Sequence, residues 1–118
     1  MIAALSVRTM LQINENNWKI YDPDRILSYK IEGFDTGSLK FGASIHPRED
    51  MMHLTHSETN CTIDFGYYGC EINLDGFYAV HVIDGNLEEA WCHPLERHES
   101  KEFLKGIENV QAMLNKYT

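Results

Sequence analysis

The sequence CTIDFGYYGCEINLDGFYAVHVI, residues 61–83, alternates apolar and polar residues and is interrupted only by turn sequences. This period-two pattern is typical of half-buried strands. It predicts three short strands, at residues 61–65, 70–74 and 77–83. Gly-Tyr-Tyr-Gly at 66–69 separates the first two, and Asp-Gly at 75–76 suits a two-residue turn whose central positions need positive φ. The stretch therefore predicts two successive antiparallel hairpins.

With these loop lengths, strand pairing assigns one face of the sheet to the core and the other to solvent. The predicted core face consists of alternating residues: Cys61, Ile63, Phe65, Cys70, Ile72, Leu74, Phe77, Ala79, His81 and Ile83. On the reverse face Asp64 lies opposite Glu71, and Asn73 lies opposite Tyr78. Two facing carboxylates weaken a sheet through repulsion unless solvent, a cation or a basic partner meets them.

Shorter alternating segments precede this region, and a helix follows it. Further strands are expected at residues 5–13, 18–21, 27–31, 39–45 and 51–56. The segments 27–31 and 39–45 are expected to pair about a three-residue loop, Asp35-Thr36-Gly37, because every apolar residue of one segment then lies opposite an apolar residue of the other on the same face. An irregular or edge segment at 87–95 leads to Ser100, the expected N-cap of the final helix. Apolar residues recur along that helix at spacings of three and four: Phe103, Ile107, Val110, Leu114 and Tyr117.

These patterns predict an α+β fold in which an antiparallel meander of about six strands packs against one amphipathic C-terminal helix. The hydrophobic fraction of 43% is enough for one core. No repeat or low-complexity linker divides the chain, so we expect a single domain over residues 1–118.

The charge of the chain restricts its partners. The formal net charge is −8, and the segment from Glu49 to Glu96 contains ten acidic residues but no Lys or Arg. This balance disfavours nonspecific binding to nucleic acid. No apolar run approaches the ~20 residues that span a bilayer, and no basic segment precedes the apolar start, as a secretory signal requires. We therefore expect a cytoplasmic protein without membrane contact.

The sequence does not assemble a catalytic or metal site. Three cysteines without Cys-x-x-Cys spacing argue against a disulfide framework and a closed zinc site. His53 and His56 point to opposite faces of an extended segment, so they should not share a metal. Cys70 and His81 are predicted neighbours on the core face, where a buried, inert thiol is the simpler interpretation. We predict no catalytic residue, no metal and no cofactor.

The preferred functional hypothesis is a noncatalytic, acidic protein-binding module. Its predicted contact residues lie on the reverse face or in the turn at 66–69: Asp64, Glu71, Asn73, Tyr78, Tyr67 and Tyr68. In size and charge the chain is similar to small acidic bacterial immunity proteins and antitoxins, which mask a basic partner. No motif carries this similarity.

Three alternatives stay open at this stage, and one of them, an enzyme, would need a convergent acid–base set that the sequence does not assemble. A small molecule would bind between the sheet and the helix, in a pocket lined by Cys70, His81, Trp91 and Tyr29. An exposed edge strand or an apolar helix face would instead support a homodimer.

Overall fold

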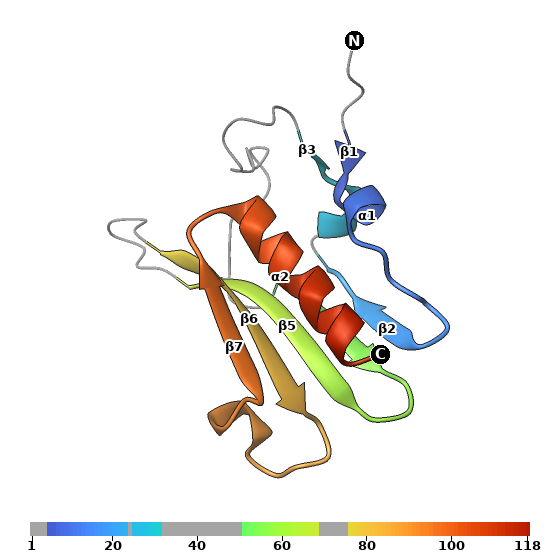
Figure 1. The fold of residues 1–118 in the computed structure, drawn as a ribbon, viewed down its shortest axis with the longest axis vertical. Helices are drawn as coiled ribbons and strands as arrows, with labels where there is room; N and C mark the ends of the chain where they lie inside the picture. The colour runs from blue at the N-terminus through green and yellow to red at the C-terminus, as the bar shows by residue number, and fades with distance from the viewer. Residues whose placement is uncertain (1–4, 24, 32–50, 69–75) are drawn as a thin grey trace.

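The structure, a computed structural model, describes residues 5–23, 25–31, 51–68 and 76–118. In these ranges a five-stranded antiparallel sheet packs against a C-terminal helix (Figure 1), which confirms the α+β class with five strands in this sheet instead of about six. The strand order is β2 (Trp18–Tyr21), β4 (Met52–His56), β5 (Cys61–Tyr68), β6 (Phe77–Asp84) and β7 (Glu96–Ser100). The helix is α2, Phe103–Lys116. Each helix in the described ranges is too short or too polar to span a lipid bilayer.

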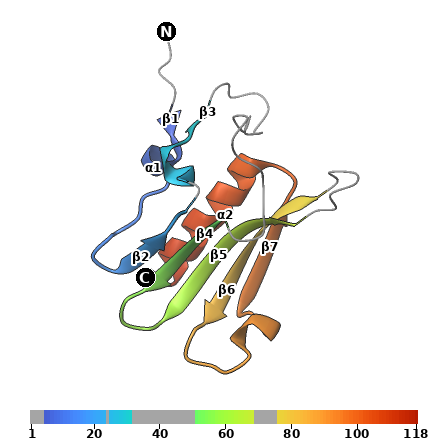
Figure 2. The same ribbon diagram turned by 180° about the vertical axis from the view of Figure 1, so that it is seen from behind.

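A second sheet of two strands pairs β1 (Leu5–Ser6) with β3 (Lys30–Ile31). These strands accompany the short helices α1 (Val7–Met10) and η1 (Ile26–Ser28). Seen from both sides, this small unit lies at one end of the main sheet, next to β2 (Figures 1 and 2).

Side-chain hydrogen bonds to the backbone explain why two of the predicted strands are only two residues long, at Leu5–Ser6 and Lys30–Ile31. The strand expected at 5–13 ends after Ser6, because Ser6 Oγ accepts a hydrogen bond from the Thr9 backbone N–H at 3.1 Å and caps α1. The strand expected at 27–31 begins instead as η1. Here the Asp22 carboxylate accepts backbone N–H groups from Ile26 at 2.8 Å and Leu27 at 3.0 Å. The partner segment 39–45 lies outside the described residues.

The strands expected at 18–21 and 51–56 are confirmed as β2 and β4. His53 and His56 do point to opposite faces, since His53 lies opposite Asp64 and His56 lies opposite Trp18. The final strand, β7, was not predicted. Its sequence, Glu-Arg-His-Glu-Ser, has no apolar alternation because the residues on the α2 face, Glu96, His98 and Ser100, are polar as well.

The pairing of β5 with β6 differs from the two predicted hairpins. β5 continues through Tyr68 and pairs directly with β6, so that Asp64 lies opposite His81 and Tyr67 lies opposite Tyr78. The predicted pairs of Asp64 with Glu71 and of Asn73 with Tyr78 are therefore wrong. Residues 69–75, which include Cys70, Glu71 and Asn73, lie outside the described ranges.

This register changes which side chains of β6 face the core. Gly66 to Tyr68, expected as a turn, are extended strand, and the resulting shift reverses the alternation along β6. Val80 and Val82 share a face with Phe65 and Ile63, beneath α2. Phe77, Ala79, His81 and Ile83, expected on the core face, lie on the opposite face. The pairing of Cys70 with His81 is also replaced, since Asp64 occupies the position opposite His81.

The core lies between α2 and one face of the sheet. From α2 it receives the buried side chains of Phe103, Ile107, Val110, Met113 and Leu114. The sheet contributes Trp18, Met52, Leu54, Ile63, Phe65, Tyr78, Val80 and Val82. The predicted amphipathic helix is thus confirmed, although its N-cap is Glu102. Ser100 Oγ accepts the Glu102 N–H at 3.0 Å, one residue before the helix begins.

Gly106 permits the close approach of α2 to the sheet. A Cβ atom at this position would lie 2.7 Å from Cε1 of Phe65 and 3.3 Å from Cβ of Tyr78. The Phe65 ring is fully buried and stacks parallel to Tyr78, with their centroids 5.8 Å apart. Real Cβ atoms do not approach other atoms as closely as 2.7 Å, so a side chain at position 106 would force this dense helix–sheet contact to shift.

We expect Gly106→Ala to leave the stability of the fold unchanged or to lower it, despite the better helix propensity of alanine. Alanine improves helix propensity by about 1 kcal/mol, but overpacking a dense core costs about 1–3 kcal/mol. Urea denaturation should show an unchanged or lower free energy of unfolding, by up to about 2 kcal/mol. The reverse exchange at an exposed helix site, Ala112→Gly, isolates the propensity term. A clear gain of stability in Gly106→Ala would contradict the close packing on Phe65.

Candidate functional site

A row of ionisable side chains crosses the face of the sheet that points away from α2. Asp64 on β5 is its centre, with His53 on β4 and His81 on β6 directly opposite in the strand register. Nε2 of His53 lies 2.7 Å from Oδ1 of Asp64, and Nδ1 of His81 lies 3.6 Å from Oδ2. The Asp64 side chain is only 1% exposed, so this carboxylate is held inside the protein between two imidazoles.

Tyr68 completes the surroundings of the carboxylate. Its hydroxyl donates a hydrogen bond to Oδ2 of Asp64 at 3.3 Å, and its ring meets His81 edge-on with centroids 5.5 Å apart. Burying a carboxylate is costly unless it is paired and hydrogen-bonded. The row therefore works as a unit, in which the imidazoles and the phenol compensate the burial of Asp64.

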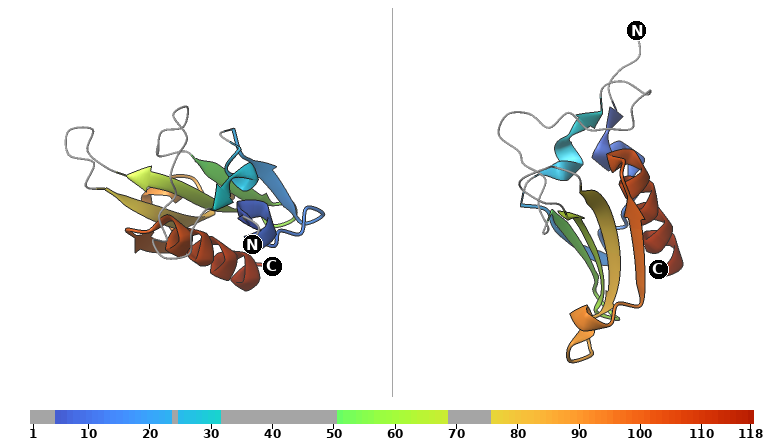
Figure 3. Two further views of the ribbon diagram at one scale, coloured as in Figure 1. Left: turned by 90° about the horizontal axis from the view of Figure 1, so that it is seen from above. Right: turned by 90° about the vertical axis from the view of Figure 1, so that its left-hand side faces the viewer.

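The same row is connected to the loop between β6 and β7. The ring of His53 contacts Tyr21 on β2, with centroids 5.7 Å apart, and Trp91, with centroids 5.8 Å apart. Trp91 belongs to η2 (Ala90–Cys92), which Figure 3 shows on the side of the sheet opposite α2. The loop therefore packs on the polar row through an aromatic contact.

This loop combines exposed apolar and acidic side chains. Leu87, Trp91 and Leu95 are 51–58% exposed, and Tyr21 is the only other large hydrophobic residue as exposed in the described ranges. Between them lie Glu88 and Glu89, both exposed. We define the acidic loop surface by seven residues, five of them in this loop and two acids nearby: Leu87, Glu88, Glu89, Trp91, Leu95, Glu58 and Asp84.

Hydrogen bonds hold the two segments of the acidic loop surface together. Asn86 Nδ2 donates to the backbone carbonyl of Thr59 at 2.7 Å, and its Oδ1 accepts from Asn60 Nδ2 at 3.0 Å. The Gly85 N–H donates to the Asn60 carbonyl at 3.0 Å. These contacts join the β4–β5 turn, which carries Glu58, to the β6–β7 loop.

Glu89 adopts a backbone conformation that is unfavourable for its residue type. Its φ is 58°, in the left-handed region that glycine or asparagine adopts most easily. The conformation precedes η2 and directs the chain toward Trp91. A glutamate at this position places an acidic residue two positions before Trp91, at a backbone cost of about 1–2 kcal/mol.

A second cluster of polar groups ties β7 to the end of α2. Oε2 of Glu96 lies 2.7 Å from Lys116 Nζ and accepts a hydrogen bond from the Tyr117 hydroxyl. His98 Nε2 lies 3.1 Å from Oε1. Lys116 first, then Tyr117 and His98, lower the pKa of Glu96 from 4.5 to about 2, although partial burial opposes them. The bond to Glu96 in turn raises the pKa of Tyr117 to about 12.

The structure places the four predicted partner-binding residues that it describes on two opposite faces of the sheet. Asp64 and Tyr68 lie in the polar row, on the face away from α2. Tyr78 is buried beneath α2, where burial raises its pKa, and Tyr67 packs edge-on against it at 5.1 Å. Because Asp64 and Tyr78 are buried, neither is exposed to a partner. Glu71 and Asn73 lie outside the described residues.

The three predicted pocket residues that the structure describes do not line one pocket between the sheet and α2. His81 and Trp91 lie on the face away from α2, so they cannot line a space between the sheet and this helix. Tyr29 packs against the edge of the core, and Cys70 lies outside the described residues. Of the other two cysteines, Cys61 is buried, which raises the pKa of its thiol, and Cys92 is exposed.

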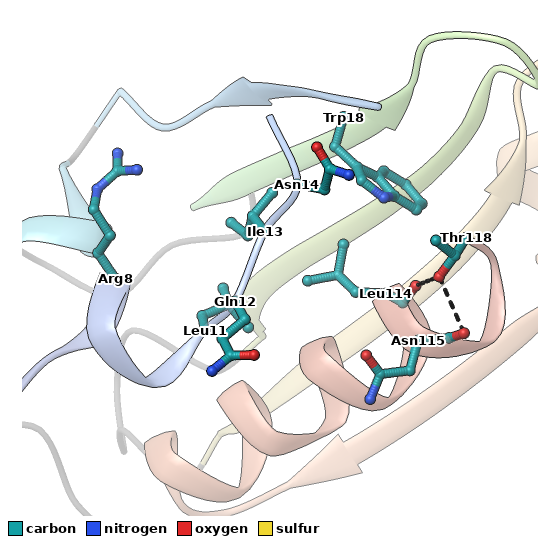
Figure 4. Close-up of a pocket in the computed structure, with 9 residues that line it drawn as sticks. All are labelled: Arg8, Leu11, Gln12, Ile13, Asn14, Trp18, Leu114, Asn115 and Thr118. Carbon is teal, nitrogen blue, oxygen red and sulfur yellow. Dashed lines mark hydrogen bonds between the residues drawn. The ribbon is translucent and has the colours of Figure 1, made fainter. Parts of the chain in front are cut away.

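A hollow does open at the C-terminal end of α2, formed by other residues. It has a volume of about 570 Å³ and lies between α2 and the segment that connects α1 with β2 (Figure 4). Its walls are Arg8, Leu11, Gln12, Ile13, Asn14, Trp18, Leu114, Asn115 and Thr118. Among the described side chains, no group of three His, Cys, Asp or Glu is placed to hold a metal ion.

Comparisons with protein-family models, curated proteins and solved structures find no match to this chain.

Some residues of the site were not predicted from the sequence. Trp91 was expected only as a pocket residue, and Leu87, Glu88 and Glu89 were not singled out. A local signal was available for these three, since one apolar and two acidic residues directly follow the turn Asp84-Gly85-Asn86, in a segment that contains no Lys or Arg. No local signal pointed to Glu96, because its partners lie twenty residues later at Lys116 and Tyr117.

Asp64→Asn should destabilise the protein, contrary to the stabilisation that a repelling pair with Glu71 would predict. The amide keeps the shape of the side chain but weakens the charge-assisted contacts with His53 and His81. We expect urea denaturation at neutral pH to show a loss of about 1–3 kcal/mol. The exposed control Glu108→Gln should change stability by less than about 0.5 kcal/mol. Equal stability of Asp64→Asn and wild type would show that the row is not held by charge.

Glu96 should make the fold acid-sensitive. A carboxylate whose folded pKa is about 2 and whose ordinary value is 4.5 stabilises the fold above pH 4.5. That contribution is lost as the pH falls from about 4.5 toward about 2. Chemical denaturation across this range should show a shallower loss of stability in Glu96→Gln than in wild type. Parallel acid limbs for the two proteins would contradict the assignment.

Proposed function

We propose that this protein is a noncatalytic binding module that contacts a basic partner protein through the acidic loop surface. The observation that carries the proposal is the concentration of Leu87, Trp91 and Leu95 in one loop together with Glu88 and Glu89. Exposed apolar side chains scattered singly are normal, whereas a local group with charged neighbours is typical of an interaction site.

The loop has the composition of an interface centre. Tryptophan is among the residues that most often dominate binding energy, because a large ring excludes water from the contact. The Trp91 indole is partly fixed by its packing on His53, so less side-chain freedom is lost on binding. The apolar side chains would supply affinity, and the surrounding acids would select the partner.

The charge of the surface favours a basic partner. Glu58, Asp84, Glu88 and Glu89 lie in a region of sequence without Lys or Arg. Complementary charge accelerates association and rejects acidic competitors. Nucleic acid is not proposed as a ligand, because its phosphates would be repelled by these carboxylates. A basic toxin neutralised by an immunity-type protein is one partner with this chemistry.

Comparative affinity capture tests the proposal. Wild type and the variant Leu87→Ser/Trp91→Ser are used as baits in lysate of the source organism, at low and high salt. Proteins bound to each bait are then quantified by mass spectrometry. We expect a basic protein that wild type retains at low salt and that the variant loses by about tenfold or more, since a hot-spot residue contributes about 2 kcal/mol or more. Glu88→Gln/Glu89→Gln should reduce the same retention.

The control Glu15→Gln/Glu108→Gln removes the same charge from exposed sites outside the acidic loop surface. It should bind like wild type. If no basic protein distinguishes wild type from the loop variants, or if the control loses binding equally, the acidic loop surface is not the contact site.

A second candidate function, small-molecule binding, is favoured by the hollow of about 570 Å³ beside α2. Its floor contains the apolar side chains of Trp18 and Leu114, and its rim carries polar groups such as Asn14 and Asn115 (Figure 4). A few polar groups around an apolar floor are common in ligand sites. A small molecule that binds in this hollow should change the fluorescence of Trp18. The variant Leu87→Ser/Trp91→Ser, which lacks the other tryptophan, should show the same change, whereas it should lose a partner bound at the acidic loop surface.

A further inference from the structure

The outer edge of β7 has a charge sequence that complements itself. β7 is the last strand of the main sheet, and within the described part of the chain β6 is its only strand neighbour. Figure 1 shows β7 at the margin of the sheet, with α2 lying inward of it. The side chains of Arg97, His98 and Glu99 are 41–51% exposed.

We propose that β7 pairs with β7 of a second copy of this chain, antiparallel and centred on His98. In this register Arg97 lies opposite Glu99 of the second copy, and Glu99 lies opposite Arg97. Residues directly opposite each other in a strand pair share a face of the sheet, so both pairs form on the face away from α2. The twofold axis at His98 makes the contact isologous, as in most dimers.

Charge selects this register over its neighbours. Centring the pair on Arg97 or on Glu99 would place two like charges opposite each other. A shift by half a residue is excluded, because it would place Glu96, on the α2 face, opposite Glu99, on the other face. Among the arrangements centred on Arg97, His98 or Glu99, only the one centred on His98 places each Arg97 opposite a Glu99, and each cross-strand pair of this kind favours association modestly.

Charged residues on an edge strand usually prevent pairing between sheets. They do so when the approaching edges repel, whereas the order Glu-Arg-His-Glu-Ser presents opposite charges to its own copy. Within one chain, Arg97 already pairs with Glu99 at 2.7 Å. In the dimer both side chains keep an opposite charge within reach, so pairing the backbones leaves no charge unpaired.

Sedimentation velocity of the purified chain tests the inference and does not depend on the partner proposed above. Wild type should dimerise with a Kd between about 1 μM and about 1 mM, and protein concentrations across this range are therefore measured. Arg97→Glu and Glu99→Arg should each weaken the dimer by about tenfold or more, because both ion pairs become like-charge pairs. Circular dichroism and thermal melting establish that each variant is folded.

Mixing the two single variants separates contacts between chains from contacts within one chain. Each variant alone presents four like charges at the twofold axis, but one copy of each presents acids to bases. The equimolar mixture should therefore dimerise again, as should the double exchange Arg97→Glu/Glu99→Arg. The inference is overturned if wild type stays monomeric throughout the range, or if it dimerises while the mixture does not. Leu87→Ser/Trp91→Ser should leave the dimer intact, and its loss there would assign self-association to the acidic loop surface.

Discussion

The direct pairing of β5 with β6 is the constraint on which the rest of the structure depends. It directs Ile63 and Phe65 toward α2 and Asp64 toward the other face, where His53 and His81 lie opposite it. Because side chains alternate along a strand, a shift of one residue would place the carboxylate beneath the helix and the apolar rings outside. The core and the polar row are therefore two results of a single register.

The polar row also explains how a loop without regular strands keeps a defined position. His53 contacts Asp64 on one side and packs on Trp91 through its ring. Asn86 holds the same loop to the β4–β5 turn through two hydrogen bonds. A loop fixed at both points can present exposed apolar side chains with little loss of conformational freedom on binding.

The C-terminal part of the fold is held by both packing and charge. Gly106 lets α2 lie against Phe65 and Tyr78, and Glu96 receives Lys116 and Tyr117 from the end of the helix. These contacts fix β7, a strand with little apolar surface of its own, at the margin of the sheet. Its fixed position is what gives the order of its charges a geometric meaning for a second copy.

The sequence by itself determined the α+β class, the strands β2 and β4, the opposite directions of His53 and His56, and the apolar stripe of α2. Each follows from local periodicity, which depends only on neighbouring residues. The tertiary structure decided the register of β6, the burial of Asp64, and the contact between Glu96 and Tyr117. These depend on pairs distant in sequence, and Gly66 to Tyr68 have the residue types of a turn although long-range pairing makes them strand. The strand β7 escaped prediction for the same reason, since it is stabilised by β6 and α2 and not by a pattern of its own.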